Sequence, residues 1–160
     1  MLLREIIRAR KVISAAGSWQ TGTMPRAAFP LSKSKGKAYR LGNRRWRAVS
    51  FSANGVLCRL MVTYNYNLGQ YQAMLGVDDG GDTKLLARLE RHPTHDGWHM
   101  HLTCDSDDAQ PGIRVGPWVR CLHGKLHKKY RSEVPNTDEE AFRKAVAVFR
   151  LDRKQVGGLV

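Results

Sequence analysis

The sequence is short of cysteine and of long apolar runs, and each shortage argues against a class of protein. Its three cysteines, Cys58, Cys104 and Cys121, are an odd number without Cys-x-x-Cys spacing. That pattern argues against a disulfide framework or a cysteine zinc finger. No apolar run approaches the ~18 residues of a membrane span, and the N-terminus lacks the unbroken apolar stretch of a secretory signal. We therefore expect a cytoplasmic protein with no membrane partner.

Acidic residues are scarce in two blocks of the chain, and the formal net charge is +13. Residues 1–50 hold twelve Lys/Arg and a single acid, Glu5, while residues 114–131 hold six Lys/Arg and no acid. The middle, 51–109, is mildly acidic, with four Lys/Arg against eight acids. Basic blocks of this kind are typical of a phosphate-backbone partner. We expect DNA or RNA, with a protein partner (antitoxin-like, or a subunit of a larger complex) as the alternative.

Hydrophobic periodicity and turn signals predict an α+β fold. The length of 160 residues fits a single domain, 1–160. We expect helices over 2–16 and after the capping-box pattern Thr137-Asp-Glu-Glu140. Between them we expect a largely antiparallel sheet of five or six strands flanked by these N- and C-terminal helices. The predicted strands are 45–52, 56–66, 70–77, 83–91, 98–104 and 113–122. Glycine and proline punctuate 18–42, which predicts an ordered crossing loop or a mobile basic loop.

Histidine is confined to one part of the chain. All six histidines lie between His92 and His127, and four of them fall within 92–101. If 98–104 is a strand, alternate side chains share a face. Trp98, Met100, Leu102 and Cys104 then form a core face, and His99, His101 and Thr103 form a polar face turned toward solvent.

A hairpin would bring a carboxylate to the same polar face. Folding 83–91 back across a loop at 92–97, with Arg91 opposite Trp98, places Glu90 opposite His99 and Arg88 opposite His101. Cross-strand neighbours on one face lie ~5 Å apart. Two imidazoles and a carboxylate with open coordination positions form a competent divalent-metal site. We predict that His99, His101 and Glu90 bind Mg²⁺, Mn²⁺ or Zn²⁺ and form the catalytic centre of a nuclease.

The stretch Gly97-Trp-His99-Met-His101-Leu resembles the His-hydrophobic-His strand of the HUH endonucleases, which include replication initiators, relaxases and single-strand transposases. The resemblance covers about six residues. It implies that His99 and His101 bind a metal on the central strand of an antiparallel sheet. It also implies a downstream tyrosine that attacks the DNA phosphate. Tyr130 is the only tyrosine after the histidine strand, so the resemblance assigns it the role of nucleophile.

The basic residues near this strand, and those of both basic blocks, are the predicted contacts to nucleic acid. The set is Arg45, Arg47, Arg88, Arg91, Lys125, Lys128 and Lys129, with Lys33, Lys35, Lys37 and Arg44 as further backbone contacts. Among the aromatic residues, we expect Trp46 and Tyr64 to lie in the core and Trp19 to be exposed.

Three other interpretations of the histidines stay open. A metal-free, toxin-type ribonuclease needs only a base, an acid and cations, which His99 and His101 (or His95 and His127) with arginines could supply. A structural zinc could use the histidines of 92–101 with Cys104 or Asp96. Finally, the histidines could line a solvated sheet face without chemistry, and the protein would be a basic nucleic-acid- or partner-binding module.

Overall fold

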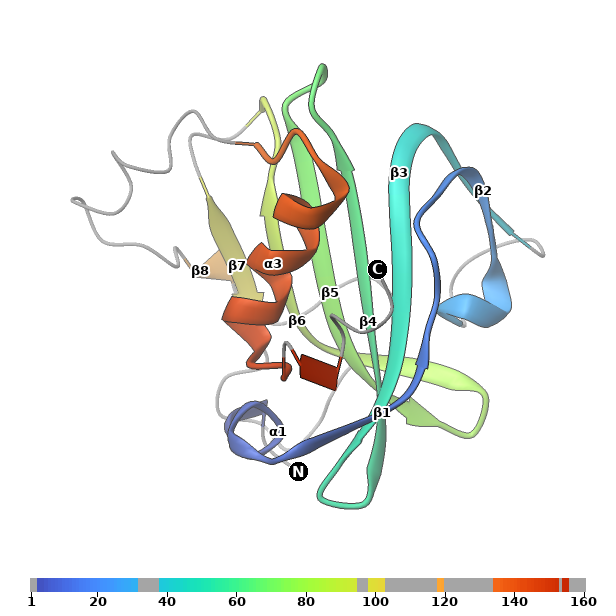
Figure 1. Cartoon of the computed structure of the whole chain (residues 1–160), viewed down its shortest axis with the longest axis vertical. Coiled ribbons are helices and arrows are strands. Elements are labelled where there is room, and N and C mark those ends of the chain that lie inside the picture. Colours follow the sequence, from blue (N-terminus) through green and yellow to red (C-terminus); the bar gives the residue numbers. More distant parts are fainter. Residues whose placement is uncertain are drawn as a thin grey trace.

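The computed structural model describes residues 3–31, 38–94, 98–102, 118–119, 134–152 and 154–155. Over these ranges the chain forms one antiparallel sheet with helices near its two ends, which confirms the predicted α+β class (Figure 1). The helices are α1 (Leu3–Arg8) and α3 (Asp138–Phe149), with a short 3-10 helix, η1 (Arg26–Ala28). The strands are β1 (Lys11–Ala16), β2 (Gln20–Pro25), β3 (Ala38–Ala53), β4 (Val56–Asn65), β5 (Gln70–Asp79), β6 (Asp82–Arg91), β7 (His99–Leu102) and β8 (Trp118–Val119).

The sheet has more strands than the five or six expected. In the part of the chain that the structure describes, seven of its eight strands run in the order β1-β3-β4-β5-β6-β7-β8, and the eighth, β2, pairs with the other half of β3. The long strand β3 makes this possible, because its first part pairs with β2 and its last part with β1. β8 covers the outer edge of β7, so the histidine strand has a neighbour on each side.

The prediction of a helix over 2–16 is wrong beyond Arg8. α1 ends at Arg8, and Lys11–Ala16 is strand β1. The Lys11 ammonium donates to the backbone carbonyls of Ile7 and Ala9 at 2.9 and 3.1 Å, which satisfies acceptors that the ended helix leaves open. The β-branched Val12 and Ile13 then pair with β3.

The loop expected over 18–42 is also wrong for its described part. Gln20–Pro25 is strand β2, and β3 begins at Ala38. Two of the glycines that suggested a loop lie in the β2–β3 pair, where the register shifts between Thr21 and Thr23. Gly22 and Gly42 have φ of 89° and 60° there, a conformation that favours glycine.

The central hairpins follow their sequence signals. Asn54-Gly55 has φ of 51° and 77° and joins β3 to β4, as an Asn-Gly two-residue turn does. β5 and β6 contain a bulge between Leu75 and Gly76. A side chain at Gly76 would lie 2.8 Å from the Lys84 carbonyl oxygen, so only glycine allows this close approach of the two strands.

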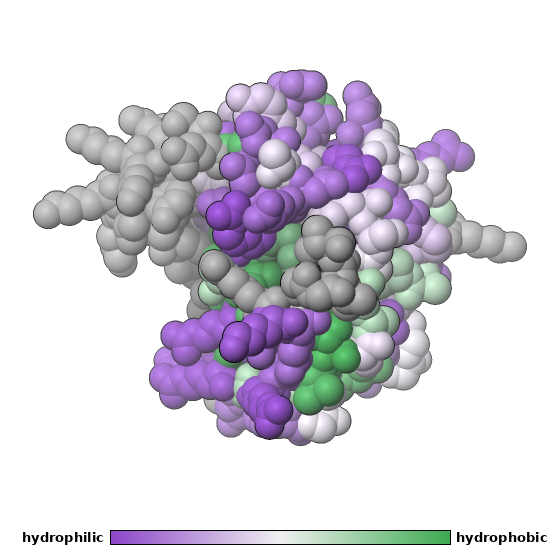
Figure 2. Space-filling view, in the orientation of Figure 1, coloured by the Kyte–Doolittle hydropathy of each residue, from purple (hydrophilic) through white to green (hydrophobic). Residues whose placement is uncertain are grey.

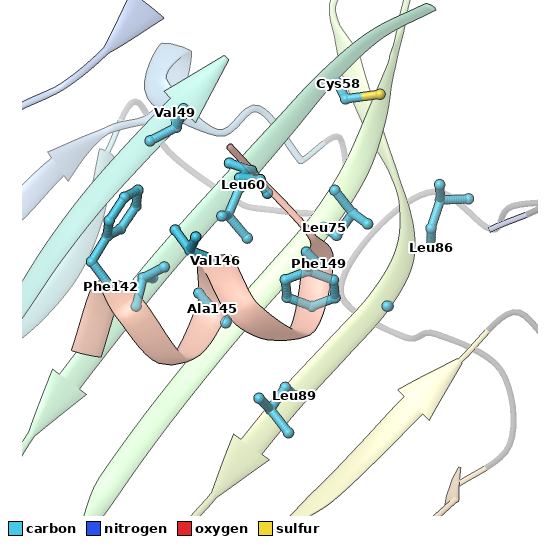
Figure 3. Packing of buried hydrophobic residues seen from close by; sticks show 14 of the residues in the cluster. Val49, Cys58, Leu60, Leu75, Leu86, Leu89, Phe142, Ala145, Val146 and Phe149 are labelled. Carbon is cyan, nitrogen blue, oxygen red and sulfur yellow. The ribbon is translucent and has the colours of Figure 1, made fainter. Parts of the chain in front are cut away.

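Helix α3 covers one face of the sheet, packed across β4 and β5. The Thr137 hydroxyl caps it by accepting from the Glu140 N–H at 3.2 Å, which confirms the predicted helix start. Phe142, Val146 and Phe149 of the helix meet Leu60 and Leu75 of the sheet in the main core (Figure 3). Trp98 joins this core, as predicted, and its ring lies 5.1 Å from that of Tyr71.

The opposite face carries a second, smaller core. Trp46, Met61, Met74 and Leu85 of the sheet are covered by residues from the β2–η1 segment. The Thr83 N–H donates to the Pro30 carbonyl at 2.7 Å, which ties this segment to the start of β6. The remainder of this face, along β5, β6 and β7, carries the polar residues described below.

Hydrophilic residues cover much of the surface on the α3 side (Figure 2). They include the α1 end of the molecule, where Arg4, Glu5 and Arg8 are exposed. No helix in the described residues is long and apolar enough to cross a membrane.

Candidate metal centre

A row of polar residues crosses four adjacent strands on the face away from α3. Thr63 pairs with Gln72, Gln72 with Glu90, and Glu90 with His99. Arg88 pairs with His101 in the next row. Cross-strand partners share a face, so these side chains rise from one surface of the sheet. The predicted register of the β6–β7 hairpin is therefore confirmed, with Glu90 opposite His99 and Arg88 opposite His101.

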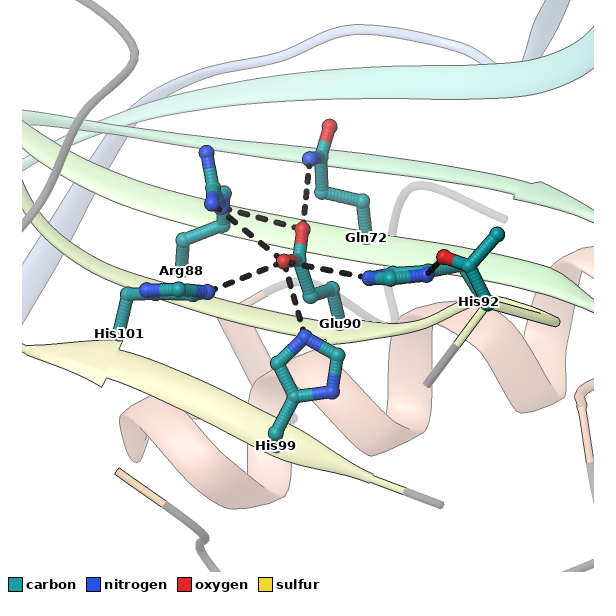
Figure 4. Close-up of polar contacts among 7 residues, drawn as sticks. Gln72, Arg88, Glu90, His92, His99 and His101 are labelled. Carbon is teal, nitrogen blue, oxygen red and sulfur yellow. Dashed lines mark hydrogen bonds and ion pairs between the residues drawn. The ribbon is translucent and has the colours of Figure 1, made fainter. Parts of the chain in front are cut away.

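The two imidazoles of β7 converge on a single carboxylate oxygen. His99 Nε2 lies 3.0 Å and His101 Nε2 3.2 Å from Glu90 Oε1. His92, just after β6, brings its Nε2 to 3.7 Å from the same oxygen. Figure 4 shows the three rings arranged around the Glu90 carboxylate. We call Glu90, His99 and His101 the Glu–His cluster.

Two further side chains hold the other carboxylate oxygen. Gln72 Nε2 donates to Glu90 Oε2 at 3.2 Å, and Arg88 Nε lies 3.1 Å from it. Arg88 also reaches Oε1 through Nη2, at 3.3 Å. Contacts of this kind orient a ligand from behind, while Oε1 stays directed at the imidazoles.

The cluster is more deeply buried than a solvated sheet face would be. His99 has 1% of its surface exposed and Glu90 8%, whereas the His101 side chain keeps 17%. The expectation that both imidazoles face outward is therefore wrong for His99. The rings do not diverge, however, and the cluster is not a set of separate solvated histidines.

Burial and charge set the protonation states in the cluster. Burial by itself would raise the pKa of Glu90, but the Arg88 guanidinium and hydrogen bonds with His99 and Gln72 outweigh it and hold the pKa below its ordinary value. Burial lowers the pKa of His101 below its ordinary 6.5, and the Arg88 charge adds to this. At pH 7 Glu90 is therefore ionised and His101 neutral, the forms in which both residues bind metals.

The Glu–His cluster could hold a metal ion. One ligand atom from each of its three residues lies within 4.8 Å of the others. Ligand atoms bonded to a common ion at ~2.0–2.2 Å lie somewhat closer together than this limit, so modest side-chain movement would suffice. Three protein ligands of this type leave coordination positions open for water or substrate.

The arginines predicted to contact nucleic acid differ in their burial and in their partners. Arg47 is buried, donates to the Gly17 carbonyl at 2.7 Å and stacks on the Phe142 ring at 4.3 Å, contrary to the surface position expected. Arg45 is partly exposed but paired with Asp138 on the α3 face. Arg88 binds Glu90, and Arg91 lines a pocket beside the cluster. Several other candidates lie outside the described residues: Lys33, Lys35, Lys37, His95, Asp96, Cys104, Lys125, His127, Lys128, Lys129 and Tyr130.

The aromatic predictions are confirmed for the core. Trp46 and Tyr64 are 3% and 6% exposed. Trp19, expected to be exposed, is half-buried and lies 5.5 Å from the Tyr64 ring in an edge-to-face contact. Sequence reasoning missed Gln72, and the available signal was a polar residue within the apolar run of β5.

No protein-family model, curated protein or solved structure matches this chain. Functional inference therefore rests on the site itself.

Proposed function

We propose that the Glu–His cluster binds a divalent metal ion and that the protein uses it to cleave phosphodiester bonds of nucleic acid. The observation that carries this proposal is the convergence of two imidazole nitrogens on one carboxylate oxygen. The whole chain has a net charge of +13, which favours a polyanionic substrate.

Each residue has a definite task under this proposal. His99, His101 and Glu90 bind the ion, and Gln72 and Arg88 fix the orientation of the carboxylate. A bound divalent ion polarises a phosphoryl oxygen and offsets the charge that develops as the P–O bond breaks. His92 lies at the edge of the cluster, where it could accept or donate a proton near a bound substrate.

The resemblance to HUH endonucleases adds a nucleophile to the proposal. It is consistent with a His-x-His strand that has a paired strand on each side within the antiparallel sheet. Tyr130 would attack the phosphate and form a covalent phosphotyrosine link with DNA, while one P–O bond of the phosphodiester breaks and the cut strand leaves with a free hydroxyl end. A denaturing gel tests this step: the wild-type protein should retain labelled DNA, and Tyr130→Phe should retain none.

A metal-free ribonuclease is the second candidate, favoured by the neutral state of His101 beside an ionised carboxylate. A neutral imidazole hydrogen-bonded to a carboxylate is the usual arrangement of a general base. This enzyme would cut RNA alone and would remain active in EDTA.

Cleavage assays with single-stranded DNA, duplex DNA and RNA test the main proposal. The wild-type protein should cut in the presence of Mn²⁺, Mg²⁺ or Zn²⁺, and EDTA should stop the reaction. His99→Ala with His101→Ala should abolish cleavage, while Glu139→Gln, on the exposed side of α3, should leave it unchanged. Failure of every metal and every substrate would refute the proposal, and so would full activity in the double variant.

A further inference from the structure

A pocket of about 180 Å³ lies beside the Glu–His cluster and shares residues with it. It lies toward the β4–β5 turn and is lined by residues of β3, β4, β5 and β6. Its lining residues are Arg44, Thr63, Gln70, Tyr71, Gln72, Glu90, Arg91 and His92.

Two arginines from distant parts of the sequence meet at this pocket. Arg44 comes from β3, and its Nε donates to Gln70 Oε1 at 3.1 Å. That bond occupies one of the five N–H donors of the guanidinium and fixes the direction of the group. Arg91 ends β6, and its Nη1 lies close enough to the Gly69 turn that a side chain there would contact it. Gln70 therefore orients the Arg44 guanidinium, and the Arg91 guanidinium lies near the β4–β5 turn.

The pocket and the cluster share residues, so a ligand of one lies next to the other. Gln72 lines the pocket and donates to Glu90 Oε2 at 3.2 Å. His92 also lines it, with Nδ1 2.6 Å from the Thr94 hydroxyl and Nε2 directed at Glu90. Figure 4 shows both side chains directed at the Glu90 carboxylate.

The charge balance of the pocket favours an anion. Among its described lining residues Glu90 is the one carboxylate, and Arg88 already pairs with it from outside the lining. Arg44 and Arg91 are the two arginines that line the pocket, and the side-chain amides of Gln70 and Gln72 line it beside them. Guanidinium forks and amide N–H groups are the usual ligands of a phosphate.

We infer that this pocket binds a phosphate group of the nucleic-acid chain, next to the phosphate that is cleaved at the Glu–His cluster. The inference rests on the proposed function and deepens it, because it assigns Arg44 and Arg91 to substrate binding. Arg44 and Arg91 bind the phosphate backbone of the nucleic acid and take no part in bond cleavage. The substrate strand then runs across β5 and β6, from the pocket toward His101.

The test measures binding of a fluorescent single-stranded oligonucleotide to metal-free protein in EDTA, where no cleavage occurs. The variants are Arg44→Gln, Arg91→Gln and the double variant, with Arg143→Gln on α3 as the matched control for loss of one arginine. The double variant should bind about tenfold more weakly at ~0.1 M salt, with a salt dependence reduced by about one to two phosphate contacts. The control should match the wild-type protein. Wild-type affinity and salt dependence in the double variant would overturn the inference, as would no binding by the wild-type protein.

Metal titration and cleavage assays of the same variants separate this inference from the proposed function. The double variant should bind metal as the wild-type protein does, and its cleavage defect should appear mainly in KM. If the wild-type protein cuts nucleic acid and the double variant cuts it with unchanged KM, the nuclease stands and the pocket assignment fails. If the double variant loses oligonucleotide binding but the wild-type protein never cuts, the pocket stands and the nuclease fails.

Discussion

Two arginine–carboxylate groups lie on opposite faces of the same sheet, and their surroundings differ. On the α3 face, Asp138 is held by Arg45, whose Nε donates to Oδ1 at 3.0 Å, and by the Tyr64 hydroxyl at 2.7 Å. On the other face, Glu90 is held by Arg88 and Gln72 but also meets the imidazoles of His99 and His101. Both carboxylates have lowered pKa values.

The two carboxylates differ in whether their neighbouring side chains can bind a metal ion. Arg45 and Tyr64 donate hydrogen bonds to Asp138, and burial raises the pKa of Tyr64 so that its phenol stays protonated. Neither side chain is a metal ligand in that state, so Asp138 serves to fasten the start of α3 to the sheet. Neutral imidazoles have a lone pair and are common metal ligands. A carboxylate held by donors alone is thus a structural tie, whereas one that also faces imidazoles is a candidate metal centre.

The largest expected effect is the loss of metal binding in Glu90→Gln. The substitution keeps the shape of the side chain but removes the negative charge, so metal affinity should fall by more than ~100-fold. Isothermal titration with Zn²⁺ and Mn²⁺ measures it. Asp138→Asn makes the same chemical change on the other face and should leave affinity unchanged. An equal loss of metal affinity in Glu90→Gln and Asp138→Asn would show that Glu90 is not a specific metal ligand.

Because Glu90 is buried beside Arg88, its variant could also be less stable. His101→Ala provides a second, less buried change at the same site. Melting curves identify conditions in which each variant is folded before metal is added. Affinity retained in a folded His101→Ala would contradict the assignment of that ligand.

Asp138→Asn should lower the free energy of unfolding by about 1–2 kcal/mol, because hydrogen bonds to a charged but partly exposed group are lost. The effect should depend on pH. The Arg45 hydrogen bond lowers the pKa of Asp138 below its ordinary 3.8. Its contribution is therefore complete above that value and is lost as the pH falls through the folded-state pKa. Urea unfolding from pH 7 to pH 2 measures this dependence. The free energy of unfolding should fall less steeply at acid pH in Asp138→Asn than in the wild-type protein, and an equal fall in both would refute the stabilising role of Asp138.

Gln72→Ala should weaken metal binding by about tenfold, since residues that orient a ligand typically contribute 10- to 100-fold. Its amide holds Glu90 Oε2 at 3.2 Å, so the carboxylate would turn more freely without it. Gln70→Ala removes the neighbouring glutamine of the same strand, which contacts Arg44 and not Glu90. Metal titration of the two variants should separate them, and identical affinities would exclude an orienting role for Gln72.

The smallest effect is expected at the α3 cap. Thr137→Ala should destabilise the protein by about 0.5–1 kcal/mol because the Glu140 N–H loses its acceptor. Thr137→Ser should keep the cap and most of the stability. Metal affinity should be the same in both, measured on folded protein. A change in affinity would show that the α3 face and the metal centre are coupled, and it would contradict their separate roles.

Local sequence patterns predicted the parts of this protein that depend on neighbouring residues. The β6–β7 register follows from alternation within each strand and a short connection, so Glu90 opposite His99 could be derived. The Asn54-Gly55 turn and the Thr137 cap have equally local causes.

Long-range pairing explains what could not be derived. Lys11–Ala16 is a strand because β3 is long enough to offer it a partner, and nothing near Lys11 in the sequence shows that length. The burial of His99 and the approach of Gln72 to Glu90 likewise depend on strands and segments that meet only in the folded sheet.

The most direct test of the Glu–His cluster is electron paramagnetic resonance of the protein loaded with Cu²⁺, an ion that imidazole binds well. Nitrogen couplings from two imidazoles are expected in the wild-type protein, and couplings from one imidazole in either His99→Ala or His101→Ala. A wild-type spectrum without imidazole nitrogen, or one that neither substitution changes, would contradict a metal centre at Glu90, His99 and His101.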